Sequence, residues 1–392
     1  MDWQTALSNH SDLAHALDSC IETLEMSLAD EPSIIFVFVS IHHQASWSLV
    51  GPVLLKRFQG CQVIGCCGAG IIGGSHEVEQ GPALTLAGAV LPGVDLKTFH
   101  FNDSDDGMDR DAERQMLLDL ADDELPQAMM VLPDPFSCNV KSFLRMADTV
   151  YPQTAIFGGI ASGGREPGQH ALFRNDKIYK SGCVGVTLTG NLTVESIISQ
   201  GCRPIGPPLF VTRATEHTIH ELDGMPALDA VERVCKALPP EELALARKAL
   251  YLGLAMEPHA QSYGPGDFLV RDLVGAMPEG RALLVAARVE TQSVVQFHVR
   301  DARSAWSELD DLLKESAEGE RQPAGALMFS CVGRGKRLYG EVGHDSRVLW
   351  QHFDALSPSG FFGNGEIGQV GGRTWVHGYT TAIILFRPGS DA

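Results

Sequence analysis

One order of elements recurs three times along this chain, and it limits the fold more than any other feature. Each pass predicts a buried strand, a helix, a strand that runs into a glycine-rich loop, and a returning strand. The three passes begin at residues 34–41, 128–139 and 325–335 and return at residues 81–93, 182–190 and 377–386. Any α/β protein alternates such elements, but glycine before each returning strand favours a duplicated architecture.

The fold class predicted is α/β, with two related domains built from these strand-helix-strand units. Large mixed sheets with helices on the outside are expected. The turn-forming segment 201–208, GCRPIGPP, suggests a domain boundary, so the domains are placed at residues 1–206 and 207–392. Other predicted elements are helices at 3–28, 47–58, 111–120, 227–238 and 302–316, the third within an acidic stretch at 102–124, and a turn at Asp223-Gly224.

Composition narrows the class of protein. With 44% hydrophobic and 20% charged residues, the 392-residue chain is globular, and its net charge of -19 disfavours nucleic acid and anionic membranes as partners. The N-terminus does not resemble a signal peptide, and no apolar run reaches the roughly 20 residues of a membrane span. Nine scattered cysteines without a C-x-x-C pair suggest neither a disulfide framework nor a zinc ribbon, so a cytoplasmic location is expected.

The first glycine loop, residues 65–77, is not a dinucleotide-binding fingerprint, because glycine and Gly81-Pro82 follow it where a helix would have to start. It can form the wall of a pocket or a tight turn. Cys66 and Cys331 at strand ends can be nucleophiles or small buried hydrophobes, and the second interpretation is favoured. The histidines at positions 42, 43, 76 and 377 can bind metal or haem iron or bond a loop carbonyl; they lack metal-ligand spacing, so neither a metal nor haem is expected.

The third pass has the most polar loops. Arg334 suits a carboxylate or another planar anion, while Asn364 and Glu366 suit a ligand amine or hydroxyl. Alternatively, Arg334 and Glu366 neutralise each other and connect the two loops. Both interpretations stay open at this point.

Three motifs together resemble the FIST family, with FIST N and FIST C domains in tandem. They are VIGCCGAGIIGGSHEVEQGPALTLAGAVLPG, MFSCVGRGKRLYG and FFGNGEIGQVGGRTWVHGYTTAIILF, and the resemblance covers residues 30–390. It implies a sensory domain for small ligands, amino acids among them, in signal transduction. It also implies alternatives, because some members resemble haem-based gas sensors and eukaryotic relatives carry an F-box.

The candidate ligand-binding residues are those that match the family's loops, together with Ser40, His43, Gly159 and Ser162, and no catalytic residue is expected. They are Ser40, His43, Cys66, Gly68, Gly70, Gly73, Gly74, Gly159, Ser162, Ser330, Cys331, Arg334, Gly335, Asn364, Gly365, Glu366 and His377. The expected function is a stand-alone cytoplasmic sensor that acts through a signalling or adaptor protein in trans. An adaptor that recognises another protein, a haem-based gas sensor and, less favoured, a thiol enzyme are the alternatives.

Overall fold

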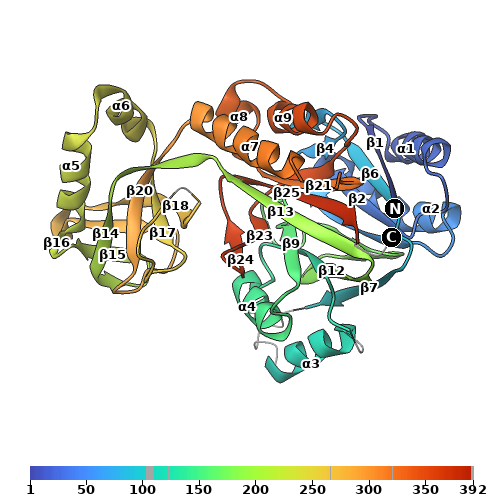
Figure 1. Cartoon of the computed structure of the whole chain (residues 1–392), viewed down its shortest axis with the longest axis horizontal. Coiled ribbons are helices and arrows are strands. Elements are labelled where there is room, and N and C mark those ends of the chain that lie inside the picture. Colours follow the sequence, from blue (N-terminus) through green and yellow to red (C-terminus); the bar gives the residue numbers. More distant parts are fainter. Residues whose placement is uncertain (103–109, 122–123, 265, 320, 390–392) are drawn as a thin grey trace. The chain divides into compact units, whose positions relative to one another are not determined.

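The chain divides into two compact units in the computed structural model, which describes residues 1–102, 110–121, 124–264, 266–319 and 321–389 (Figure 1). Unit 1 contains Met1–Ile198, Leu309–Val376 and the chain from Thr380 onward. Unit 2 contains Ser199–Glu308 and His377–Tyr379. Neither unit is one continuous stretch of the sequence. The domain boundary expected at 206/207 stays a prediction.

Unit 1 is built from three repeats of the same order of elements. The first has β1 (Asp2–Ser8), α1 (Leu13–Ser27), β2 (Ile34–Ser40), η1 (Ile41–Leu49), α2 (Val50–Arg57), β3 (Gln62–Gly68), β4 (Ile71–Gly73), β5 (His76–Val78) and β6 (Leu84–Val90). The second has β7 (Val94–Phe101), α3 (Arg110–Ala121), β8 (Ala128–Pro133), α4 (Val140–Val150), β9 (Ala155–Gly159), β10 (Leu172–Arg174), β11 (Lys177–Tyr179) and β12 (Cys183–Gly190).

The third repeat is interrupted by unit 2. It has β13 (Leu192–Gln200), then α7 (Ala302–Ala317), β21 (Gly325–Cys331), α8 (Lys336–Tyr339), α9 (His344–His352), β22 (Ser359–Gly363), β23 (Glu366–Val370), β24 (Arg373–His377) and β25 (Thr380–Pro388). The repeated order predicted from the sequence is thus confirmed, and unit 2 is an insertion between β13 and α7.

The repeats exchange hairpins. Their sheets have equivalent strand orders, β1-β6-β2-β3-β10-β11, β7-β12-β8-β9-β23-β24 and β13-β25-β21-β22-β4-β5. In each sheet the first four strands come from one repeat, with one parallel pair in the middle, and the last two are the hairpin of another repeat. Each glycine-rich loop therefore leads the chain from its own sheet to the edge of a neighbouring one.

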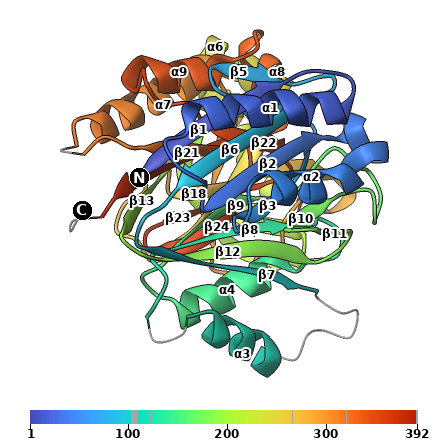
Figure 2. The same cartoon turned by 90° about the vertical axis from the view of Figure 1, so that its right-hand side faces the viewer.

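The inner faces of the three sheets share one core. Alternate residues of β2 divide between two clusters: Phe36 and Phe38 pack into this common core, while Ile35, Val37 and Val39 pack outward beneath α1 and α2. The other two sheets bury their outer faces under α3 with α4 and under α7 with α9. The helices accordingly lie on three sides of unit 1 (Figures 1 and 2).

The N-terminal segment differs from the sequence prediction of one helix over residues 3–28. Residues 2–8 form strand β1, which pairs antiparallel with β6, and α1 begins only at Leu13, after the N-cap Asp12. Trp3 stacks on Phe36 and Phe386 in the common core, at 5.3 and 4.9 Å between ring centroids. Burial of this indole outweighs the helical spacing of the leucines, which holds only from Leu13 onward.

Unit 2 is a closed antiparallel sheet with two helices. Its strands are β14 (Cys202–Thr215), β15 (Thr218–Leu222), β16 (Met225–Pro226), β17 (Leu250–Ala255), β18 (Phe268–Met277), β19 (Ala282–Val285) and β20 (Val294–Arg300). The order is β14-β20-β17-β18-β19-β15-β16, and β14 also pairs with β15, which closes the sheet. The helices are α5 (Ala227–Ala237) and α6 (Pro240–Lys248), and a short 3-10 turn, η2 (Pro278–Gly280), precedes β19.

Most other predicted elements are present. Helices α5 and α7 lie within a few residues of their predicted ranges, α4 and α9 are the helices expected in the second and third passes, and residues 47–58 divide between η1 and α2. Asp223 and Gly224 both have positive φ, 49° and 74°, as the predicted turn requires. The predicted helix at 111–120 is α3, while residues 103–109 and 122–123 of the surrounding acidic stretch lie outside the described residues.

We predict that Gly360→Ala strongly destabilises unit 1. A Cβ at Gly360 would lie 1.7 Å from the Met328 carbonyl oxygen of the paired strand β21, so the two central strands would have to separate. Overpacking of a core costs about 1–3 kcal/mol and occasionally more. Urea unfolding measures the loss. The control is Gly280→Ala, where nothing lies within 4 Å of the added atom; equal stability of the two variants would contradict the prediction.

Candidate functional site

The glycine-rich loops of the three repeats meet at one place, which we call the loop junction and define as residues 68–70, 160–163 and 363–366. Backbone hydrogen bonds join the loops in pairs. Phe362 N donates to Gly70 O at 2.9 Å, which joins the third loop to the first. Ile160 N donates to Gly365 O at 2.9 Å and Asn364 N donates to Ile160 O at 3.0 Å, which joins the second loop to the third. The junction thus combines backbone from all three repeats.

Ser162 holds the junction together. Its buried hydroxyl accepts a hydrogen bond from Ala69 N at 2.8 Å and donates to the carbonyl oxygen of Phe362, so one side chain of the second repeat bridges the first and the third. Asn364 adds a bond from its side-chain nitrogen to Ala161 O, at 3.0 Å, while the residue itself is exposed. The junction therefore reaches the protein surface at Asn364.

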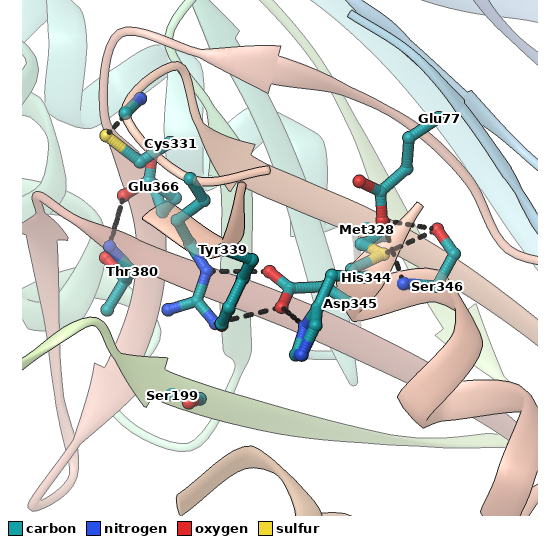
Figure 3. A network of polar contacts seen from close by, with 12 residues as sticks. Glu77, Ser199, Met328, Cys331, Tyr339, His344, Asp345, Ser346, Glu366 and Thr380 are labelled. Atoms are coloured by element: carbon teal, nitrogen blue, oxygen red, sulfur yellow. Dashed lines mark hydrogen bonds and ion pairs between the residues drawn. The ribbon is translucent and has the colours of Figure 1, made fainter. Parts of the chain in front are cut away.

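Glu366 places a carboxyl group inside the junction. It is fully buried at the start of β23, opposite Gly159 of β9. Its Oε2 accepts bonds from Thr380 Oγ1 at 2.7 Å and Thr380 N at 3.3 Å, whereas its Oε1 has no hydrogen-bond partner among the described residues (Figure 3). Burial raises the pKa of Glu366 to about 8, although Thr380 and the charge of Arg334 oppose the shift. The carboxyl group is therefore largely protonated near neutral pH.

Arg334 forms a buried ion pair with a residue that the sequence analysis did not select. Its Nε and Nη2 donate to the two carboxylate oxygens of Asp345 at 2.6 and 3.1 Å, and Nη2 also donates to Tyr339 Oη at 2.6 Å. Both charged side chains are almost fully inaccessible. Burial by itself would raise the pKa of Asp345, but Arg334 and His344 outweigh it and hold that pKa well below its usual range.

The hairpin β4–β5 of the first repeat reaches the same network. Glu77 Oε1 accepts bonds from the backbone and hydroxyl of Ser346, both 2.8 Å, and so caps the first turn of α9 (Figure 3). Burial and the nearby negative charge of Asp345 raise the pKa of Glu77 to about 7. Glu79 Oε1 accepts from Lys336 N at 2.8 Å, and at Gly335 a φ of 57° and the approach of Glu79 both require glycine.

The structure brings about half of the predicted site residues together. Ser40 and Cys331 end the strands paired with Gly68 and Gly363, so they border the junction. The residues within it or at its edge are Ser40, Gly68, Gly70, Gly159, Ser162, Ser330, Cys331, Asn364, Gly365 and Glu366. Ser40 Oγ accepts from Ala83 N at 3.0 Å, and Ser330 Oγ is buried without a hydrogen-bond partner among the described residues.

The other predicted residues lie elsewhere. Gly73 and Gly74 are at the turn of the β4–β5 hairpin, His43 is buried in η1, and His377 belongs to unit 2. Arg334 and Gly335 belong to the Asp345 network. Cys66 is fully buried in the common core, and burial raises the pKa of its thiol well above the usual value. Two surface hollows of about 780 and 530 Å³ also lie apart from the junction, beside β13 and α7 and beside β7 and α3.

Four polar residues of this region were missed in the sequence analysis: Glu77, Tyr339, Asp345 and Ser346. Asp345 and Ser346 lie in the first turn of α9, which begins at His344 after the N-cap Gly343, and an acidic residue and a small hydroxyl residue are typical of a helix N-terminus. That signal identifies a helix start and carries no information about Arg334. Glu77 gives no signal at all, because its partner is 269 positions away.

Two family models match this chain in tandem. The FIST N domain model matches residues 33–225 and the FIST C domain model matches residues 227–369. The chain belongs to the FIST family. FIST domains are linked to small-ligand sensing in signal transduction.

Relatives of this FIST protein are uncharacterized. It is 36% identical to an uncharacterized protein of Mycobacterium tuberculosis over 326 residues, 83% of each chain, and 32% identical to one of Mycobacterium bovis over 375 residues, 95% of each. Among solved structures, cyanuric acid hydrolase from A. caulinodans aligns over 99% of both chains with a TM-score of 0.34 and 8% identity. That likeness is too low to support any inference.

We predict that Arg334 and Asp345 stabilise the FIST fold as a pair. Arg334→Met leaves Asp345 as a buried charge without its guanidinium, and removal of one partner of a buried pair costs about 3–5 kcal/mol. The double variant Arg334→Met with Asp345→Asn should recover part of the loss, because no charge is then left unpaired. Urea unfolding of the four proteins in the cycle measures the coupling. Additive losses in the double variant would contradict the pairing.

We predict that Glu366 makes stability fall with rising pH. Its folded-state pKa of about 8 exceeds the ordinary value of 4.5, so the folded state holds the proton more tightly than the unfolded state. The free energy of unfolding should therefore decrease from about pH 4.5 to about pH 8 by an amount that Glu366→Gln removes. Denaturant unfolding of both proteins at several pH values gives this difference. A difference independent of pH would contradict the shifted pKa.

Proposed function

We propose that the chain is a cytoplasmic sensory protein that binds a small ligand with a primary amine, such as an amino acid or a similar polar metabolite, at the loop junction. The family supplies the general role, small-ligand sensing in signal transduction. None of the helices in the described ranges is long and apolar enough to cross a membrane. We propose that the signal passes to another protein in trans.

The observation that carries this proposal is the Oε1 atom of Glu366. A fully buried carboxyl oxygen without a hydrogen-bond partner costs free energy that a donor from a ligand would recover. An ammonium group is the donor that a carboxylate binds most strongly, since the hydrogen bond is then charge-assisted. Binding of an ammonium would also favour the ionised form of Glu366, so the carboxyl group would release its proton on binding.

The surroundings of Glu366 suit the rest of such a ligand. Glycine backbone of the three loops can approach a ligand closely, and Asn364 offers an amide at the surface of the junction. We assign binding rather than turnover to the site, because Cys66 is fully buried in the common core, where burial raises the pKa of its thiol. Arg334 is committed to Asp345 in this arrangement and acts on the ligand only through its charge near Glu366.

Thermal shift against a panel of amino acids, amines and matched carboxylates without an amine identifies the ligand class, and calorimetry then measures its affinity. We expect Glu366→Gln to lower the affinity for an amine about ten- to hundred-fold, since it removes a charge-assisted bond worth about 1.5–3 kcal/mol. The matched control is Glu341→Gln, because Glu341 is exposed and paired with Arg347 at the surface.

Proton release gives a second measurement. Near pH 7, calorimetry in buffers with different ionisation enthalpies should show close to one proton released by the unchanged protein and none by Glu366→Gln. Failure of every amine to bind, or binding that Glu366→Gln leaves unchanged, would overturn the proposal.

A further inference from the structure

Two cysteines of the second repeat lie side by side, although they are far apart in the sequence. Cys138 lies in the turn between β8 and α4, and Cys183 is the first residue of β12, which pairs with β8 through Cys183 and Pro133. Both sulfur-bearing side chains pack in one cluster beneath α3 and α4. Burial and the neighbouring Cys138 side chain raise the pKa of the Cys183 thiol.

The backbone around the two cysteines is fixed in this approach. Gly182 N donates to Ser137 Oγ at 2.8 Å and Asp134 N donates to Gly182 O at 2.8 Å, so residues next to each cysteine are bonded across the gap. Ser137 Oγ in turn donates to Asp134 Oδ2 at 2.7 Å. The two thiols are therefore held together by a framework that does not depend on them.

The two thiols differ in access to solvent. Cys138 is half-buried, whereas Cys183 is 1% exposed. Burial raises the pKa of the Cys183 thiol well above its usual value, so Cys183 does not react first. An accessible thiol beside a buried one is the arrangement of an attacking and a resolving cysteine.

We propose that Cys138 and Cys183 are a site of oxidative modification, at which a hydroperoxide converts the two thiols into an intramolecular disulfide. The Cys138 thiolate attacks the terminal oxygen of the hydroperoxide; an S–O bond forms, the O–O bond breaks, and the alkoxide leaves as the alcohol after taking up a proton. The sulfur of Cys183 then attacks the Cys138 sulfur, the S–O bond breaks, and the hydroxyl leaves as water with the Cys183 proton. The hydroperoxide is reduced by two electrons and the thiol pair is oxidised by two.

This site lies next to the loop junction. Asp134, in the same turn as Cys138, bonds His170 through Oδ1 at 2.9 Å, and His170 Nε2 accepts from Gly164 N at 3.2 Å. Gly164 directly follows the second loop of the junction. The disulfide would thus form in the segment that holds this loop in place. The proposal does not depend on which ligand the junction binds.

The test is a peptide map of the folded full-length chain after treatment with tert-butyl hydroperoxide, with free thiols blocked before digestion under non-reducing conditions. We expect a cross-linked pair of peptides joined through Cys138 and Cys183, 2 Da lighter than their sum, which dithiothreitol separates. Cys138→Ser should abolish the cross-link. The matched control is Cys235→Ser, which removes another half-buried thiol and should leave the cross-link unchanged.

Because Cys183 is buried and its variants could unfold, the map of the unchanged protein decides the question. A Cys138 that is oxidised to the sulfinic acid, or blocked as a free thiol, while Cys183 keeps its thiol would overturn the proposal. So would a disulfide from Cys138 to another cysteine, such as Cys66.

Discussion

Hairpin exchange between the three sheets of unit 1 is the constraint on which the rest of the structure depends. Strand β4 completes the sheet of the third repeat through β22, β10 completes that of the first through β3, and β23 completes that of the second through β9. No repeat contains all six strands of any sheet, and the inner face of each sheet packs in a core that all three repeats share. The common core, with Phe36, Phe157 and Phe386 from three different repeats, exists only when all three are assembled.

The same exchange explains why charged groups are buried where repeats meet. A chain that leaves one sheet for the edge of the next must pass through the interior, and its polar groups must find partners there. Glu77, on the hairpin that crosses to the third sheet, bonds the N-terminus of α9, and nearby Arg334 pairs with Asp345 within the third repeat. Glu366 is only half satisfied, because Thr380 bonds one of its two carboxyl oxygens. Glu77 and Asp345 thus have structural partners, whereas Glu366 carries the proposed ligand-binding role.

The sequence predicts the repeated units well, because the local spacing of apolar residues indicates each strand and helix. Strand β2 is an unbroken apolar run, and α5 has a turn and an amphipathic pattern of its own. The sequence does not show that hairpins change sheets, since pairing across repeats leaves no local pattern. Glu366 could be selected because it lies in a glycine-rich loop. Its contact with Thr380 and the pairing of Arg334 with Asp345 could not be predicted, because contacts between separate segments leave no local pattern either. At Trp3 the local pattern predicts the wrong element. The spacing of the leucines predicts a helix, but burial of the Trp3 side chain in the common core favours a strand.

The position of the last strand has a consequence for synthesis. All six strands of the first sheet lie before residue 180, so that sheet can form while the chain is still being made. In the third sheet, β25 (Thr380–Pro388) lies between β13 and β21 and pairs with β21 along its length. Until β25 leaves the ribosome, β21 has an open edge and the common core lacks one wall. Strand β13 (Leu192–Gln200) must therefore wait for β25 while residues 201–379 are made, and its edge stays open to foreign partners during that time.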